Sequence, residues 1–147
     1  MSSDNIIKFE IVTPERTVLK EEVVQVSVPT KEGEITVLPG HIPLVASLNP
    51  GVIEIVKEDS THNIMSVSGG FIEVSKDRVV ILADTAERAE EIDETRVDAA
   101  RKQAEESVKD MRHFDQERFA GISAKIAKEL ARDRAAKRWK KIKSLDK

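Results

Sequence analysis

The composition of the chain changes abruptly after Ala83, and this change separates two parts that follow different folding rules. All five prolines lie before it, and so does every one of the six glycines except Gly121. Short β-branched runs punctuated by glycine and proline are typical of a β-sandwich, whereas long stretches of Ala, Glu, Lys and Arg favour helices. The sequence therefore predicts a β + α chain, with an N-terminal antiparallel β-sandwich over residues 1–84, a linker over 85–92 and a C-terminal two-helix antiparallel hairpin over 93–147.

The first part shows the period-two alternation of half-buried strands. Ile7, Phe9 and Ile11 alternate with the charged residues Lys8 and Glu10, which places the apolar side chains on one face of a strand. Similar runs recur with turn signals about every 8 to 12 residues. Because hairpins dominate such a pattern, we expect antiparallel pairing. Since only 3% of the residues are aromatic, the core must consist mostly of Val, Ile, Leu and Ala.

The second part carries two narrow apolar stripes at helical spacing. Asp93 suits the N-cap of the first helix, because its carboxylate can accept backbone N–H groups. The first stripe consists of Val97, Ala100, Ala104, Val108 and Met111. After a break at Arg112-His113, the second consists of Phe119, Ile122, Ile126, Leu130, Ala135, Trp139 and Ile142. Burying such narrow stripes barely offsets the entropy lost on ordering the helices, so we expect a hairpin that can open.

The residue patterns that catalysis or metal binding needs are missing from the sequence. The chain has no Cys, and His41, His62 and His113 lie far apart without partners at metal-ligand spacing. No phosphate-binding loop of the Gly-x-x-x-x-Gly-Lys type occurs, so we expect a non-catalytic protein without a metal. A net charge of −3 gives no drive towards nucleic acid. No apolar run approaches the roughly 20 residues that cross a bilayer, so any membrane contact must go through a partner.

A cluster of cations marks the end of the second predicted helix. It includes Arg132, Arg134, Lys137 and Arg138, and within residues 132–143 only Asp133 is acidic. Cations near a helix C-terminus are favourable, so the cluster can be a solvated face, or else an electrostatic handle for an acidic partner. A further alternative is a polyanion-binding β-sandwich/helix module that uses this basic helix, which a steep salt dependence of affinity would indicate.

Several motifs in the first part occur in a fixed order. The leading one is Glu32-Gly33-Glu34 followed by Leu38-Pro39-Gly40-His41, in which Pro39 and Gly40 favour a tight reversal. The further motifs are Asn49-Pro50-Gly51, Ser68-Gly69-Gly70-Phe71-Ile72-Glu73-Val74 and Val80-Ile81-Leu82-Ala83-Asp84-Thr85-Ala86. In this order and at these spacings they resemble the epsilon subunit of the rotary (F-type) ATP synthase. The resemblance covers nearly the whole chain.

The resemblance implies a non-catalytic subunit of the central stalk. In that family the sandwich binds the gamma shaft and rests on the rotor ring of c subunits, which couples proton flow to ATP synthesis. The ring-contact loop falls on Lys31, Glu32 and Gly33, and the loop histidine beside the shaft falls on His41. The extended hairpin inhibits ATP hydrolysis by the catalytic alpha/beta head through a basic face, here Arg132, Arg134, Lys137 and Arg138. The implied location is the cytoplasmic face of the bacterial inner membrane, as a peripheral protein.

Some bacterial members of the family also bind ATP as a regulatory ligand on the folded hairpin. The residues that match their motif are Glu87, Ile92, Asp93, Arg96, Arg134 and Arg138. The chain departs from the motif at Val97, which replaces an Ala, and at Gln103, where an Arg would be expected. The planar guanidinium groups of two arginines one helical turn apart suit phosphate oxygens. The alternative is that Asp93 only caps the helix and that the arginines contact acidic residues of the catalytic head.

Overall fold

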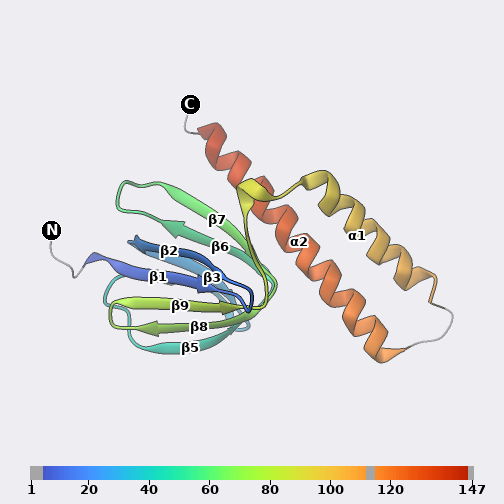
Figure 1. The fold of residues 1–147 in the computed structure, drawn as a ribbon, viewed down its shortest axis with the longest axis horizontal. Helices are drawn as coiled ribbons and strands as arrows, with labels where there is room; N and C mark the ends of the chain where they lie inside the picture. Colours follow the sequence, from blue (N-terminus) through green and yellow to red (C-terminus); the bar gives the residue numbers. More distant parts are fainter. Residues whose placement is uncertain (1–4, 112–114, 146–147) are drawn as a thin grey trace.

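The structure, a computed structural model, describes residues 5–111 and 115–145. The helix break expected at Arg112-His113 lies outside the described residues. Figure 1 shows a curved β structure beside a pair of long helices. The strands are β1 (Ile7–Val12), β2 (Thr17–Val23), β3 (Gln25–Thr30), β4 (Gly33–Val37), β5 (Leu44–Leu48), β6 (Gly51–Val56), β7 (His62–Val67), β8 (Gly70–Ser75), β9 (Arg78–Ala83) and β10 (Ala86–Arg88). They are followed by the 3₁₀ helix η2 (Ala89–Glu91) and the α-helices α1 (Glu94–Lys109) and α2 (Gln116–Leu145).

The strands form one continuous sheet that folds back on itself into a sandwich. Its order is β10-β7-β6-β3-β5-β8-β9-β1-β2, and β4 pairs with β3. Neighbouring strands are antiparallel except β1 and β9, which are parallel and pair Lys8 with Arg78. A parallel pair cannot be closed by a tight hairpin, and here the connection runs through all the strands in between. The predicted β-sandwich followed by two helices is confirmed, with β1 and β9 as the exception to antiparallel pairing.

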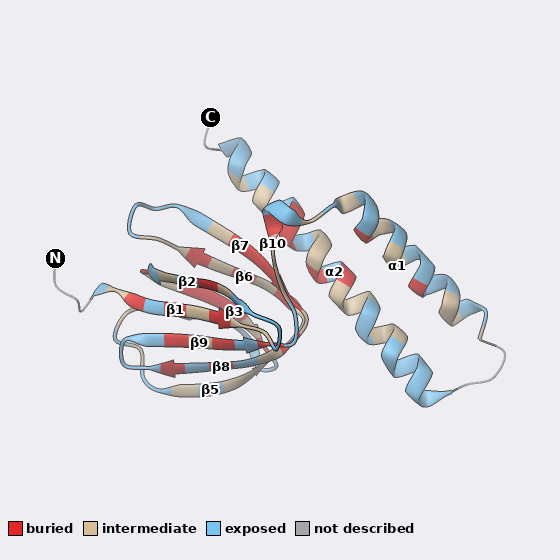
Figure 2. Ribbon diagram, viewed as in Figure 1, coloured by how far each residue is buried: buried red, intermediate tan, exposed pale blue. Residues whose placement is uncertain are grey.

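The core of the sandwich is aliphatic and follows the predicted alternation. Strand β6 buries every second residue along its whole length, and Figure 2 shows buried positions recurring along the strands. The largest side chains with almost no exposure include Phe9, Ile11, Ile53, Ile55, Ile72 and Ile81. Gly70 allows β8 and β9 to approach closely, because a Cβ at this position would lie 2.1 Å from the carbonyl oxygen of Leu82. Its φ of +132° also favours glycine.

The segment 85–92, which we expected to be a linker, carries secondary structure of its own. Strand β10 pairs antiparallel with β7, with Ala86 opposite Val67 and Arg88 opposite Met65. Helix η2 follows directly, and its Ala89 is buried. The chain therefore leaves the sandwich alongside β7 before it enters α1.

Helices α1 and α2 lie side by side as an antiparallel hairpin, and α2 also packs on β6 and β7 (Figure 1). Small residues line the buried side of α2, namely Ala131, Ala135 and Ala136. A second apolar cluster forms where α2 meets the sandwich, from Ile64, Ala89, Ala135, Val52, Ile92, Trp139 and Ile142. Phe119 and Leu130, expected on the buried stripe, are 40% and 37% exposed. The N-terminal half of α2 extends beyond the sandwich in Figure 1, so nothing from the sandwich covers it there.

Candidate functional site

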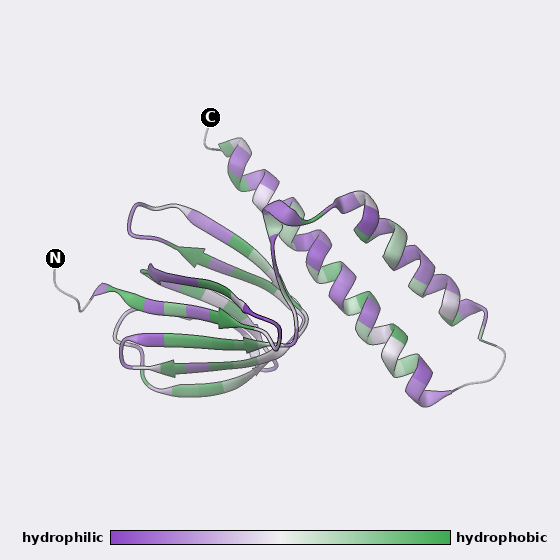
Figure 3. Cartoon of the chain, in the orientation of Figure 1, coloured by the Kyte–Doolittle hydropathy of each residue, from purple (hydrophilic) through white to green (hydrophobic). Residues whose placement is uncertain are grey.

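An exposed apolar surface lies on the strands farthest from the hairpin. Phe71 on β8 is directly opposite Leu82 on β9 and Ser47 on β5, so these side chains share one face of the sheet. Val45 lies two residues before Ser47 and points to the same face. Figure 3 shows how hydrophobic β5, β8 and β9 are along their length. We call the following exposed residues the apolar surface: Leu38, Ile42, Val45, Phe71 and Leu82.

The turn between β3 and β4 holds Lys31, Glu32 and Gly33 at one end of β4. Gly33 has a φ of +119°, which suits a residue without a Cβ. The Thr30 hydroxyl donates to the carbonyl oxygen of Gly33 at 2.5 Å and accepts from the backbone N–H of Glu32 at 3.2 Å. These bonds fix the turn from inside, so the side chains of Lys31 and Glu32 extend into solvent.

His41 lies in the loop at the other end of β4, beside the apolar surface. Its backbone N–H donates to the carbonyl oxygen of Leu38 at 3.1 Å, closing the predicted Pro39-Gly40 reversal. Its Nδ1 lies 2.6 Å from the carbonyl oxygen of Ile42, so Nδ1 carries the proton in this bond. The structure thus places His41 between two members of the apolar surface. Lys31, Glu32 and Gly33 lie about 15 Å along β4 from it, at ~3.3 Å per strand residue.

Arg132 on α2 bonds to carboxylates that lie far from it in the sequence. Its Nε and Nη2 donate to the two carboxylate oxygens of Glu87 at 2.7 and 3.2 Å. Its Nη1 donates to Glu129, one turn earlier on α2, at 2.9 Å. Hydrogen bonding to Glu87 is the main cause that raises the pKa of Arg132 above its usual value. Such a bidentate pair is the strongest geometry available to a guanidinium.

The other cations of the predicted basic face also have partners within the chain. Arg138 pairs with Glu54 on β6, whose other carboxylate oxygen lies 2.8 Å from Nδ1 of His62. Lys137 bonds to Asp133 at 2.8 Å, and Arg134 donates to the carbonyl oxygen of Leu130 at 3.3 Å. Asp133 is the only acidic residue within 132–143 of the sequence, and the fold adds the carboxylates of Glu87 and Glu54 from distant segments. The sequence does not mark these two pairs, because Glu54 lies in the predicted sandwich and Glu87 in the predicted linker, both far from α2 along the chain.

The residues expected to bind ATP do not line one cavity in the described structure. Glu87 is held by Arg132, and Ile92 packs in the apolar cluster below α2. The Asp93 carboxylate caps α1 by accepting the N–H groups of Thr95 and Arg96 at 3.0 and 3.3 Å. Arg134 and Arg138 line an open groove of about 590 Å³, formed otherwise by Pro29, Thr30, Gly33, Glu34, Asn49, Pro50, Gly51 and Val52. The candidate set is thus divided between β10, the start of α1 and the groove beside α2.

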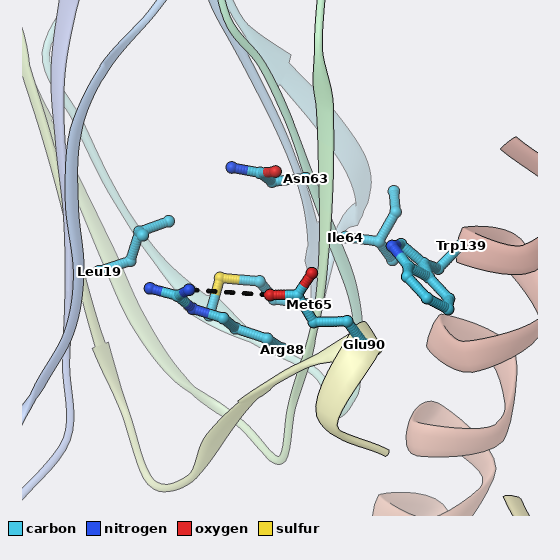
Figure 4. A pocket seen from close by; sticks show the side chains of 7 residues that line it. All are labelled: Leu19, Asn63, Ile64, Met65, Arg88, Glu90 and Trp139. Atoms are coloured by element: carbon cyan, nitrogen blue, oxygen red, sulfur yellow. Dashed lines mark ion pairs between the residues drawn. The ribbon is translucent and has the colours of Figure 1, made fainter. Parts of the chain in front are cut away.

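A small cavity beside Trp139 shows no catalytic arrangement. Figure 4 shows Trp139 lying against Ile64. It also shows the ion pair of Arg88 with Glu90, in which Nη1 and Oε1 are 3.8 Å apart. The cavity measures about 40 Å³ and is lined by Leu19, Asn63, Ile64, Met65, Arg88, Glu90 and Trp139. It has room for little more than a water molecule. Across residues 5–111 and 115–145, no cluster of His or acidic residues is suited to a metal, and neither helix is long and apolar enough to span a membrane.

Comparison with known proteins agrees with this architecture. Residues 6–89 match the family model of the ATP synthase Delta/Epsilon chain, beta-sandwich domain. The ATP synthase epsilon chain of Herpetosiphon aurantiacus is 54% identical over 104 residues, which cover 71% of this chain and 76% of the relative. The ATP synthase epsilon chain of Chloroflexus aggregans is 45% identical over 130 residues, which cover 88% of this chain and 91% of the relative.

A solved structure extends the similarity to three dimensions. It is the Euglena gracilis mitochondrial ATP synthase, in an assembly of OSCP, F1 and c-ring. One of its chains superimposes with a TM-score of 0.76 at 26% identity, over 86% of this chain and 79% of that one. This chain therefore belongs to the family of ATP synthase epsilon chains, as a non-catalytic subunit of that complex.

Proposed function

We propose that this subunit couples rotation of the rotor ring to ATP synthesis by binding the gamma subunit through its apolar surface. The observation that carries the proposal is the exposure of Ile42, Val45 and Phe71, at 74%, 71% and 56%. Val45 and Phe71 lie on one face of the sheet, where Glu73 is opposite Val45, and Ile42 lies in the loop that leads into β5. Large apolar side chains exposed together in this way mark a surface that another protein covers. The hairpin packs on β6 and β7 instead, so gamma can bind β5, β8 and β9 while the hairpin stays folded.

The β3–β4 turn supplies the second contact of this proposal, with polar loops of the c subunits. Lys31 and Glu32 extend from a turn that hydrogen bonds hold rigid, which suits a contact that must transmit force. Leu38 and Ile42 of the apolar surface lie beyond the far end of β4, whereas Phe71 lies near the turn. The backbone N–H of Lys31 donates to the carbonyl oxygen of Ser47 at 3.1 Å, and Ser47 is directly opposite Phe71. The proposed ring and shaft contacts therefore adjoin each other on the sandwich, and each has its own side chains. Contact with the membrane then comes only through the complex, which makes the subunit a peripheral protein on the cytoplasmic face.

In this proposal the two C-terminal helices inhibit ATP hydrolysis. When α2 leaves the sandwich, Arg132 loses Glu87 and keeps Glu129 of its own helix, and Arg138 loses Glu54. The donors released in this way can bind acidic segments of the alpha/beta head. A polyanion is a weaker candidate for the same face, because the folded hairpin presents these arginines already paired with Glu87 and Glu54.

The coupling function is tested with membranes whose ATP synthase has been depleted of its own epsilon subunit. Adding this chain should restore ATP-driven proton pumping, because the rotor is again joined to the ring. Glu32→Lys should bind the gamma-containing head as tightly as the original chain and restore less pumping, since the substitution reverses the charge at the ring contact. Failure of the unmodified chain to bind the head would overturn the proposal.

The inhibitory function is tested by neutralising Arg132, Arg134, Lys137 and Arg138 to Gln. The variant should lose inhibition of hydrolysis and keep its affinity for gamma, because the substitutions lie on α2 and gamma contacts the sandwich. Lys109→Gln combined with Lys125→Gln removes exposed cations elsewhere in the hairpin and should leave inhibition intact. Inhibition that survives the fourfold neutralisation would exclude the electrostatic mechanism.

A further inference from the structure

The contact between α2 and the sandwich combines an apolar cluster with a partly buried ion-pair cluster. On α2 the apolar part consists of Ala135, which is fully buried, and of Trp139 and Ile142, and Trp139 packs against Ile64 (Figure 4). Apolar burial stabilises docking without regard to direction. The ion pairs therefore supply the directional part of this contact.

Arg132 is the centre of the ionic part and bonds to two carboxylates. It connects α2 to β10 through Glu87 and satisfies Glu129 on its own helix. The Glu129 side chain is only 7% exposed, and those of Arg132 and Glu87 are 21% and 30% exposed. A carboxylate as buried as Glu129 is costly without a partner, because it has lost most of its hydration. Docking without Arg132 would leave that charge uncompensated.

Two further ion pairs hold the same helix in the same position. Arg138 pairs with Glu54 on β6, and Lys140 bonds to Glu94 at the start of α1 at 2.8 Å. The first pair orients α2 on the sandwich, and the second orients it on α1. All of these partners are side chains of this chain, so the docked state needs no external ligand to neutralise its arginines.

We propose that the cluster of Arg132, Glu87 and Glu129 is an internal latch that keeps α2 docked on the sandwich without a nucleotide, with Arg138 and Glu54 as a second contact. Opening the latch exposes both guanidinium groups, so an acidic partner competes with Glu87 and Glu54 for them. Ionic strength weakens the latch, because its ion pairs are only partly buried and therefore open to screening. The inference concerns the isolated chain and does not depend on whether the released helix inhibits hydrolysis.

Trp139 provides the measurement, because it is the single tryptophan and lies in the docking contact. Its fluorescence is followed during urea titration of the full chain, while amide NMR signals of β6 and β8 report separately whether the sandwich stays folded. Arg132→Gln should raise the ratio of undocked to docked chains about tenfold, and Glu87→Gln by a smaller factor, since Glu129 still holds Arg132 there. Lys125→Gln removes an exposed cation of the same helix and should leave the ratio unchanged.

Salt and nucleotide complete the test. Raising the NaCl concentration should lower the urea concentration at which half of the original chains are undocked. The effect should be smaller for the double variant Glu87→Gln/Arg132→Gln, which keeps only the contact of Arg138 with Glu54 for salt to screen. Equal midpoints for Arg132→Gln and Lys125→Gln would overturn the proposal. So would solvent-like Trp139 emission from the nucleotide-free chain that becomes buried-type only after Mg-ATP is added, because docking would then depend on the nucleotide.

Discussion

Replacing Phe71 by Thr tests the gamma-binding surface with the least disturbance of the fold. Phe71 is 56% exposed in the free chain, and Thr keeps the β propensity of the strand, so folding should be almost unaffected. A Phe side chain offers roughly 200 Å², so about 110 Å² remains for gamma to cover. At about 25 cal/mol per Å² this corresponds to nearly 3 kcal/mol, an upper value because binding also costs entropy.

The expected result is a dissociation constant roughly 30-fold to 100-fold higher, since each 1.4 kcal/mol changes it about tenfold. The assay is calorimetric titration of the epsilon-depleted catalytic head with the chain, and circular dichroism checks the fold of each variant. Leu145→Ser is the matched control, because Leu145 is 75% exposed at the end of α2 and far from β8. Binding of Phe71→Thr within twofold of the original would show that gamma does not cover this surface.

Three further substitutions test the fold. Gly70→Ala should destabilise the sandwich by about 3 kcal/mol in urea unfolding, because its Cβ would meet the carbonyl oxygen of Leu82 at a positive φ; a stability loss below about 0.5 kcal/mol would contradict this close approach. Gly121→Ala should stabilise α2 by roughly 1 kcal/mol, since no atom outside the helix lies within 4 Å of the added Cβ, and an unchanged helical signal in thermal unfolding would count against it. Asp93→Ala should cost α1 about 1 kcal/mol and speed amide exchange at Thr95 and Arg96, whereas Asp93→Asn should retain the cap; equal exchange rates in the two variants would refute the capping role.

The fold could largely be predicted from the sequence because each half carries one strong period. The alternation of Ile7, Phe9 and Ile11 assigns β1 and its inward face, and the Pro39-Gly40 reversal appears where it was expected. Periodicity identifies which face of a strand or helix is buried, but it does not identify the strand with which a strand pairs. The parallel pairing of β1 with β9 and the pairing of β10 with β7 join segments distant in sequence, and no local signal marks either.

The candidate site was harder to predict, because its contacts cross between the two parts of the chain. Glu87, a predicted ATP contact, pairs with Arg132, which is 45 positions away, and no local signal marks this pair. The buried side of α2 was also misjudged at Leu130, because the helix divides its contacts between α1 and the sandwich and buries small alanines instead. Helical spacing alone cannot separate two packing faces that lie next to each other.

The most direct test of the whole account is ATP hydrolysis by an epsilon-depleted catalytic head, titrated with the full chain and with a version that ends after Glu91. The shorter version keeps β10 and η2, which pack on β7, and lacks both helices. We expect both versions to bind the gamma-containing head and only the full chain to inhibit hydrolysis. Equal inhibition by both would remove the helices from the mechanism, and failure of both to bind would contradict the assignment of the apolar surface to gamma.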